Sequence, residues 1–136
     1  MKGLDTNVLL RFLIQDDKVQ GPAASAYLRR TCTADDPGFV NCIVLCEIVW
    51  VLEAAYGYHR PAVADVIERI LRTEELLVED SDSAWSALAN YRRTSADFAD
   101  ALIGRNNRAH GCDATATFDR KAATLDEFKL LTEASC

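Results

Sequence analysis

The chain lacks an excess of positive charge. Its 136 residues include 15 lysines and arginines against 21 aspartates and glutamates, a formal net charge of −6. A general basic coat for nucleic acid is therefore excluded. A nuclease is not excluded, because bound metal ions offset a local cluster of carboxylates. The longest apolar runs, residues 42–46 and 48–52, fall far short of the ~20 residues that span a bilayer, so we expect no membrane anchor.

Cysteine pairs of the CxxC kind are also missing, and the five cysteines are an odd number. This usage predicts reduced, partly buried thiols rather than a disulfide framework. The N-terminal apolar stretch is interrupted by Asp5 and Arg11, which argues against a signal peptide. We therefore expect a cytoplasmic protein.

The short motifs of several enzyme classes are absent. Without GxSxG, P-loop or GxGxxG sequences, serine hydrolases, nucleotide triphosphatases and dinucleotide-binding enzymes lack support. A zinc site would have to use Cys42, Cys46, His110 and Cys112. Their spacing matches no known zinc module, so buried thiols are the better interpretation.

The sequence that is present has a globular composition, with 49% hydrophobic and 26% charged residues. Its length and the absence of repeats or long linkers predict a single domain over residues 1–136. Short β-prone runs alternate with longer helical patterns. The expected strands are residues 2–4, 38–41, 76–78, 113–118 and 128–130. The expected helices are residues 6–14, 19–31, 43–56, 61–72, about 81–92, and one that begins at Ser95 or Asp97 and ends at Gly111.

Alternating strands and helices predict an α/β fold with a mainly parallel sheet covered by helices on both faces. Ligands bind such sheets outside the carboxyl ends of the strands. Asp5 follows the first expected strand and Asp119 follows the fourth. We therefore expect both carboxylates at the same edge of the sheet.

Glu47 is the only charged residue in the stretch CIVLCEIVWVL, residues 42–52. A helix that is apolar on nearly all sides is expected to be mostly buried. A carboxylate inside it is costly unless it is paired, protonated or bound to a metal ion. The alternative is a glutamate at the edge of the helix that reaches water or pairs with an arginine.

Further acids end or begin other apolar stretches. Asp97 and Asp100 in DFADALI are three residues apart and share one helix face. Helix capping explains Asp97 well but explains Asp100 less well, and capping alone is a sufficient explanation of Asp5 or Asp119 taken singly. Taken together, these acids predict a site of carboxylate oxygens, which suits Mg²⁺ or Mn²⁺. The matching chemistry is metal-assisted phosphodiester hydrolysis or phosphoryl transfer.

Four segments in order resemble the PIN-domain ribonucleases, and more closely the VapC-type toxins of type II toxin–antitoxin pairs. They are DTNVLLR (5–11), LCEIVWVL (45–52), DFADALI (97–103) and ATFDRKA (116–122). The resemblance implies a PIN-like three-layer α/β/α fold with a mainly parallel central sheet. It also implies a Mg²⁺- or Mn²⁺-dependent endoribonuclease that acts as a toxin.

By that resemblance Asp5, Glu47, Asp100 and Asp119 match the catalytic, metal-binding acids of the family. Asp97 matches an additional acid one helical turn earlier and ranks below the other four. The family also implies an RNA substrate, a cognate antitoxin whose tail lies in a groove and blocks the acidic site, and a homodimer.

Substrate contacts are expected near the ends of these segments. Thr6, Asn7 and Thr117 are candidates for orienting carboxylates or water. Basic residues near the acids are candidates for binding phosphates, although solvated helix faces explain each one equally well: Arg11, Arg105, Arg108, Arg120 and Lys121.

Two other functions stay open. One is a metal-dependent phosphatase or phosphotransferase that uses Asp5 as its nucleophile. Haloacid-dehalogenase-like phosphatases place an acid where this chain has Asn7, which counts against that enzyme. The other is a non-catalytic binding module with an acidic pocket, and the presence of all four acids counts against it.

Overall fold

A computed structural model describes residues 1–132 of the chain. It divides into two compact units, an N-terminal unit (Met1–Ser81) and a C-terminal unit (Asp82–Cys136), and each is described separately below. Cys136, one of the five predicted thiols, lies outside the described residues, whereas Cys32, Cys42, Cys46 and Cys112 are free cysteines. None of the helices within residues 1–132 is long and apolar enough to cross a membrane.

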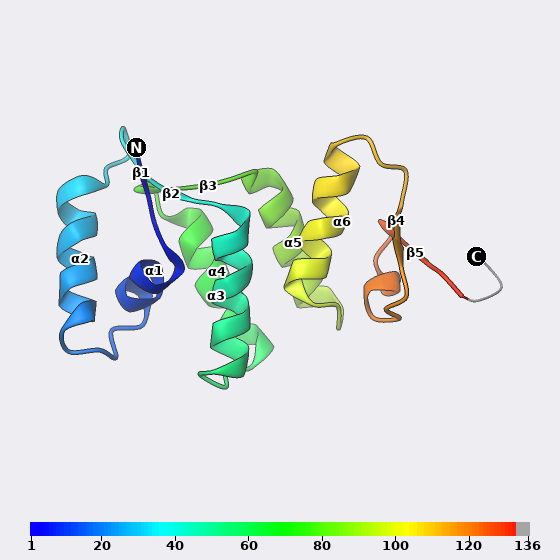
Figure 1. The fold of residues 1–136 in the computed structure, drawn as a ribbon, viewed down its shortest axis with the longest axis horizontal. Helices are drawn as coiled ribbons and strands as arrows, with labels where there is room; N and C mark the ends of the chain where they lie inside the picture. Colours follow the sequence, from blue (N-terminus) through cyan, green and yellow to red (C-terminus); the bar gives the residue numbers. More distant parts are fainter. Residues whose placement is uncertain (133–136) are drawn as a thin grey trace. The chain divides into compact units, whose positions relative to one another are not determined.

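The N-terminal unit contains a three-stranded parallel sheet (Figure 1). Its strands are β1 (Lys2–Gly3), β2 (Gly38–Val40) and β3 (Leu76–Val78), with β2 in the middle. Lys2 is paired with Gly38, and Val40 is paired with Val78. All three strands lie where the sequence predicts them, within one or two residues at their ends.

Four helices accompany this sheet. They are α1 (Thr6–Leu13), α2 (Gln20–Thr31), α3 (Cys42–Ala54) and α4 (Arg60–Arg72). The core of the unit consists of side chains with no exposed surface, drawn from α1, β2, α3 and α4: Leu9, Val40, Leu45, Ile48, Leu52, Val63, Ile67 and Ile70. Burying each such side chain stabilises the fold by roughly 1.5–3 kcal/mol relative to leaving it exposed, so this apolar layer is a large favourable term in the folding of the unit.

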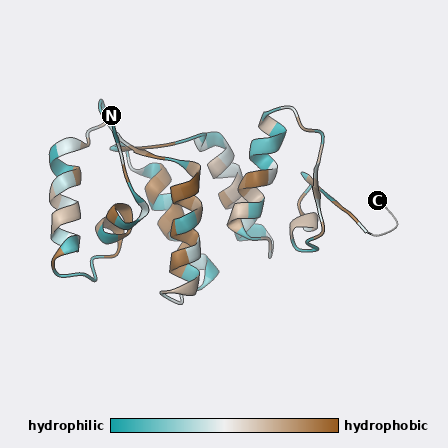
Figure 2. Cartoon of the chain, viewed as in Figure 1, coloured by the Kyte–Doolittle hydropathy of each residue, from teal (hydrophilic) through white to brown (hydrophobic). Residues whose placement is uncertain are grey.

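The prediction that α3 is buried nearly all round is wrong. Figure 2 shows α3 as a strongly apolar helix, but only one side of it is buried. Ile43 and Trp50 are 72% and 68% exposed, and Glu47, which lies between them on the same face, is also exposed. Glu47 is therefore a surface carboxylate within an exposed apolar stripe. Hydrophobic composition alone does not decide which face of a helix packs.

The C-terminal unit combines two helices with a two-stranded parallel sheet. Helix α5 (Ser81–Arg93) begins at the boundary of the units, and α6 (Phe98–Ala109) follows it. Strands β4 (Thr115–Thr117) and β5 (Phe128–Leu130) are separated by a 3₁₀ turn, η1 (Ala122–Thr124). The rings of Tyr91 and Phe98 meet edge to face at a centroid distance of 5.9 Å, which ties α5 to the start of α6.

Helix α6 and strand β5 approach each other closely at Gly104. A Cβ atom at that position would lie 2.6 Å from Cε2 of Phe128 and 3.0 Å from Cβ of Glu127. Glycine is therefore required here by the packing of the strand on the helix rather than by backbone conformation.

The α/β class and the parallel pairing of strands are confirmed. The strands form two sheets rather than the single sheet predicted, because β4 forms its hydrogen bonds with β5. The predicted strand over residues 113–118 is three residues long, and the η1 turn was not predicted. Asp5 follows β1 and Asp119 follows β4, each at the carboxyl end of its own strand.

Candidate metal centre

Three aspartates of the C-terminal unit converge. One carboxylate oxygen from each of Asp97, Asp100 and Asp119 lies within 4.8 Å of the other two. We call these residues the aspartate triad. Asp97 and Asp100 come from the start of α6, and Asp119 comes from the turn after β4. Strand β4 and the η1 turn thus bring a distant part of the sequence to the N-terminal end of this helix.

The triad has the electrostatics of an incomplete ionic site. The pKa of the Asp100 carboxyl is raised above its ordinary value by burial, and then by the charges of Asp97 and Asp119. None of these causes favours ionisation. Like charges at this separation repel unless a cation lies between them, so the three oxygens form a favourable position for a positive ion.

The residues of the triad are held in different ways. Asp97 occupies the N-cap position of α6, yet its side chain makes no capping hydrogen bond. Capping therefore does not account for the direction of its carboxylate. Asp119 is fixed by its surroundings, because the backbone N–H of Lys121 donates to Asp119 Oδ1 at 2.8 Å and the Asp119 N–H donates to Thr117 Oγ1 at 3.0 Å.

The N-terminal unit contains a second acidic group, formed around Thr6. Asp5 is the N-cap of α1, and its Oδ1 accepts a hydrogen bond of 2.9 Å from the Thr6 N–H. The Thr6 hydroxyl donates to Glu47 Oε1 at 2.6 Å. Thr6 therefore links the end of β1 to the exposed face of α3 and orients the Glu47 carboxylate. The partner of the Thr6 hydroxyl is 41 residues away in sequence, and a part for Thr6 in orienting carboxylates for a reaction stays a prediction.

A groove of about 470 Å³ lies beside Asp5 in the same unit. Its walls come from α1 and α2 and include Asn7, Arg11 and Tyr27. Arg11 is held within the unit, since its guanidinium donates to Gln20 Oε1 at 2.9 Å and meets Asp16 Oδ1 at 3.5 Å. These contacts explain Arg11 as a residue that braces α1 against the loop before α2.

The other predicted basic residues fall into two sets. Arg120 and Lys121 are exposed beside Asp119. Arg105 and Arg108 instead line a pocket on α6, together with Glu127. Glu127 was not among the acids selected from the sequence. The only sequence signal for its burial is the apolar character of the nearby Leu125 and Phe128.

The zinc arrangement receives no support from the geometry. Within residues 1–132, the aspartate triad is the one group of three or more cysteine, histidine or acidic side chains close enough to hold a metal ion. The backbone N–H of Cys42 donates a hydrogen bond to Glu79 Oε1, and its thiol donates one to the Glu79 carbonyl oxygen. Burial and the nearby Glu79 raise the pKa of the Cys42 thiol to about 11, which disfavours the thiolate that binds zinc.

Comparison with known proteins identifies the family. The PIN domain family matches residues 3–128 of the chain. The VapC ribonuclease of Aquifex aeolicus (strain VF5) is 30% identical to it over 126 residues, which cover 92% of each protein. No solved structure gives a significant match. The match spans both units and all four segments that carry the resemblance, so this chain belongs to the PIN-domain family and, within it, to the VapC type.

Proposed function

We propose that this protein is a Mg²⁺- or Mn²⁺-dependent endoribonuclease that hydrolyses RNA phosphodiesters and acts as the toxin of a toxin–antitoxin pair in the cytoplasm. The observation that carries the proposal is the aspartate triad, three converging carboxylates in a PIN-domain chain. The relative of the VapC type is named as a ribonuclease, and the similarity extends over nearly the whole of both chains.

The donor set fits a hard divalent cation. All three candidate ligands are carboxylate oxygens, which Mg²⁺ and Mn²⁺ prefer, whereas protein zinc sites usually include cysteine or histidine. A bound ion would relieve the repulsion that raises the pKa of Asp100. When bound, such an ion supplies Lewis-acid chemistry, lowering the pKa of bound water and stabilising negative charge on a phosphate.

The chain's own residues have defined parts in this proposal. Asp100 and Asp97 present carboxylates from one helix face, and Asp119 is held opposite them by the backbone N–H of Lys121. Arg120 and Lys121 are exposed next to Asp119 and are suited to binding RNA phosphates, which positions the chain without reading its sequence.

Asp5 and Glu47 join the catalytic set through their places in the family's segments. The Thr6 hydroxyl donates to Glu47 Oε1 at 2.6 Å, and the Thr6 backbone N–H donates to Asp5 Oδ1. Both carboxylates therefore have fixed directions. We propose that residues 1–136 form a single PIN-like domain and that Asp5, Glu47, Asp100 and Asp119 are its catalytic residues.

The same proposal includes two protein partners. One is a cognate antitoxin, and the groove of about 470 Å³ beside Asp5, with its walls from α1 and α2, is suited to receiving the tail of such a partner. The other is a second copy of the chain. The exposed apolar stripe of Ile43 and Trp50 on α3 supports an association of this kind.

The experiment that tests the proposal is an RNA cleavage assay. Purified protein is incubated with structured and unstructured RNAs in Mg²⁺, in Mn²⁺ and in EDTA. Asp100→Asn is prepared in parallel, and Asp113→Asn, which changes an exposed aspartate outside the triad, is the matched control. Cleavage that needs the metal, survives in Asp113→Asn and disappears in Asp100→Asn would support the nuclease.

Other outcomes contradict the proposal in distinct ways. Cleavage that Asp100→Asn retains would come from a contaminating nuclease. A folded protein that binds Mg²⁺, leaves every RNA intact and releases phosphate from a phosphomonoester would be the phosphatase that uses Asp5. A folded protein that binds no Mg²⁺ would contradict the metal centre itself.

A further inference from the structure

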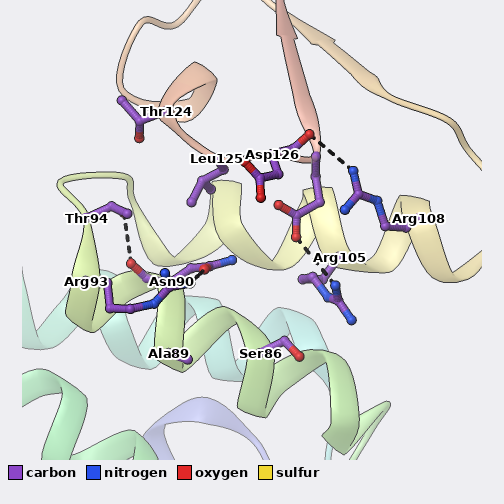
Figure 3. Close-up of a pocket in the computed structure, with 11 residues that line it drawn as sticks. Ser86, Ala89, Asn90, Arg93, Thr94, Arg105, Arg108, Thr124, Leu125 and Asp126 are labelled. Atoms are coloured by element: carbon purple, nitrogen blue, oxygen red, sulfur yellow. Dashed lines mark hydrogen bonds and ion pairs between the residues drawn. The ribbon is translucent and has the colours of Figure 1, made fainter.

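A second pocket lies in the C-terminal unit, among α5, α6 and the segment between η1 and β5 (Figure 3). Its volume is about 300 Å³, which is within the range of small-ligand sites. Figure 3 shows Arg93 on α5 and Arg105 and Arg108 on α6 around this space. The aspartate triad does not contribute to its lining, so the pocket is a separate feature of the unit.

The inner part of the pocket holds an ion pair that is poorly satisfied. Glu127 is buried, with a side chain 6% exposed, and its Oε2 lies 3.7 Å from a terminal nitrogen of Arg105. That separation is longer than a hydrogen bond. Arg105 is the more exposed partner, with 37% of its side chain accessible, so the cost falls on Glu127, because a buried carboxylate is costly unless its hydrogen bonds are satisfied.

Arg105 adds a second group whose hydrogen bonding is incomplete. Its Nε is the one buried side-chain nitrogen or oxygen, among the residues that the structure describes, that has no hydrogen-bond partner. Buried polar groups are nearly always paired, and an exception calls for an explanation such as strain, a functional role, or a bound water or ion. A ligand that fits here has an acceptor for Arg105 beside a donor for Glu127.

Guanine has this arrangement along one edge of its ring. Its O6 is an acceptor of the kind that arginine binds. The adjacent N1–H and exocyclic amino group are donors, and both can reach one carboxylate. The corresponding edge of adenine does not present an acceptor followed by two donors. A phosphate group offers acceptors alone, and the carboxylates of Asp126 and Glu127 in the lining would repel it.

The rim of the pocket suits the backbone that carries such a base. Arg93 and Arg108 are exposed at its edge. Arg93 donates to Asn90 Oδ1, and Arg108 donates to the Asp126 carbonyl oxygen at 3.2 Å. These bonds hold two guanidinium groups beside the opening, where they can contact phosphates while the base enters.

We propose that this pocket binds a guanine base of single-stranded RNA, with Arg105 on O6 and Glu127 on the two neighbouring N–H groups. The inference rests on the proposed ribonuclease function for its biological meaning, because a base pocket in the unit that carries the aspartate triad would favour RNA substrates that contain unpaired guanine. The binding itself does not depend on cleavage and is tested without it.

The test is calorimetric titration of the intact protein, in EDTA, with GMP, IMP, AMP and inorganic phosphate. We expect GMP to bind. IMP lacks only the exocyclic amino group and loses a bond to a charged acceptor, so it should bind at least about tenfold more weakly. AMP and inorganic phosphate should bind more weakly still. This comparison changes the ligand alone and requires no variant to fold.

Two variants then assign the binding to the pocket. Glu127→Gln and Arg105→Lys should each weaken GMP binding by at least about tenfold, whereas Glu74→Gln and Arg30→Lys, which change exposed residues of the N-terminal unit, should leave it unchanged. Guanine-independent binding, in which all the nucleotides and phosphate bind alike, would overturn the proposal in favour of an anion site. The absence of GMP binding to the folded wild-type protein would also overturn the proposal.

The two proposals fail separately. If the protein cleaves RNA with metal but binds GMP no better than the other nucleotides, the guanine pocket is contradicted and the nuclease is supported. GMP binding that Glu127→Gln abolishes, in a protein that cleaves no RNA, would establish the pocket and contradict the nuclease.

Discussion

The two acidic groups of this chain are held in opposite ways. In the N-terminal unit, Asp5 and Glu47 both accept hydrogen bonds from Thr6, one from its backbone and one from its hydroxyl. In the C-terminal unit, Asp97, Asp100 and Asp119 face one another within 4.8 Å, and burial and repulsion raise the pKa of Asp100. The fold supplies hydrogen bonds to both acids of the first group, whereas in the second group Asp119 accepts one from the Lys121 N–H and the repulsion among the three carboxylates would be offset by a cation. We therefore expect metal binding to depend most on the triad.

The largest expected effect follows from removing one charge of the triad. Asp100→Asn should reduce metal-dependent RNA cleavage by at least about a hundredfold, since even residues that only support metal ligands commonly contribute roughly 10–100-fold. Its melting temperature without metal should not fall, because the substitution also removes the repulsion that raises the pKa of Asp100. Cleavage assays and thermal denaturation in EDTA measure the two quantities.

Metal titration sharpens that result. Saturating Mg²⁺ should raise the unfolding free energy of the wild type by about 2.7 kcal/mol at a hundred times its dissociation constant. It should have a much smaller effect on Asp100→Asn, while the matched control Asp113→Asn should follow the wild type. A melting temperature that drops in Asp100→Asn even in EDTA would mean that this carboxylate supports the fold rather than a metal ion.

A pair of helix glycines compares the packing of the two units. Gly104→Ala would place Cβ 2.6 Å from Phe128 Cε2, whereas Gly21→Ala in α2 would meet the flexible end of Gln15 at 3.0 Å. We expect Gly104→Ala to lower the unfolding free energy by about 1–2 kcal/mol, overpacking being partly offset by the better helix propensity of alanine. Gly21→Ala should be neutral or slightly stabilising. Denaturant unfolding of both variants measures the difference, and equal effects would contradict a close α6–β5 contact.

A smaller effect is expected from the link between the acids of the N-terminal unit. Thr6→Val removes the hydroxyl that donates to Glu47 Oε1 at 2.6 Å and keeps the backbone bond to Asp5. One such bond contributes about 0.5–1.5 kcal/mol, so cleavage should fall by no more than roughly tenfold. Thr6→Ser, which keeps the hydroxyl, should cleave RNA as fast as the wild type. Equal activity of the valine and serine variants would show that the orientation of Glu47 has no influence on the reaction.

Most of the secondary structure was predictable, because periodicity and capping are local. The strands over residues 76–78 and 128–130 have the predicted bounds, and Asp97 takes one of the two positions predicted for the start of α6. The separation into two sheets was not predictable, since strand order depends on which hydrogen bonds form between distant segments. Alternation alone does not contain that information.

The candidate site was predictable in part, for the same reason. Acids that end apolar stretches identify Asp100 and Asp119, but only the fold brings their oxygens within 4.8 Å. The burial predicted for Glu47 is wrong, because its helix has an exposed face and its carboxylate is exposed and accepts a hydrogen bond from Thr6. Glu127 was not predicted, because the burial of a single acid just before a strand leaves no periodic signal in the sequence.

The last prediction concerns pH and separates repulsion from metal binding. Burial and the neighbouring carboxylates raise the pKa of Asp100 above 3.8. Between pH 3.8 and the raised pKa, the folded protein therefore holds a proton that the unfolded chain has released. The contribution of this group to stability is complete below that range and is lost as the pH rises through the folded pKa.

The asparagine side chain introduced by Asp100→Asn does not titrate, so in EDTA the variant should gain stability relative to the wild type as the pH rises. Saturating Mg²⁺ should reverse the sign, because the ion binds only the ionised carboxylate. Denaturant unfolding at several pH values, with and without Mg²⁺, measures both slopes. A flat difference in EDTA would contradict the repulsion within the triad, and an unreversed slope in Mg²⁺ would contradict the metal site, so each half of the argument can fail independently.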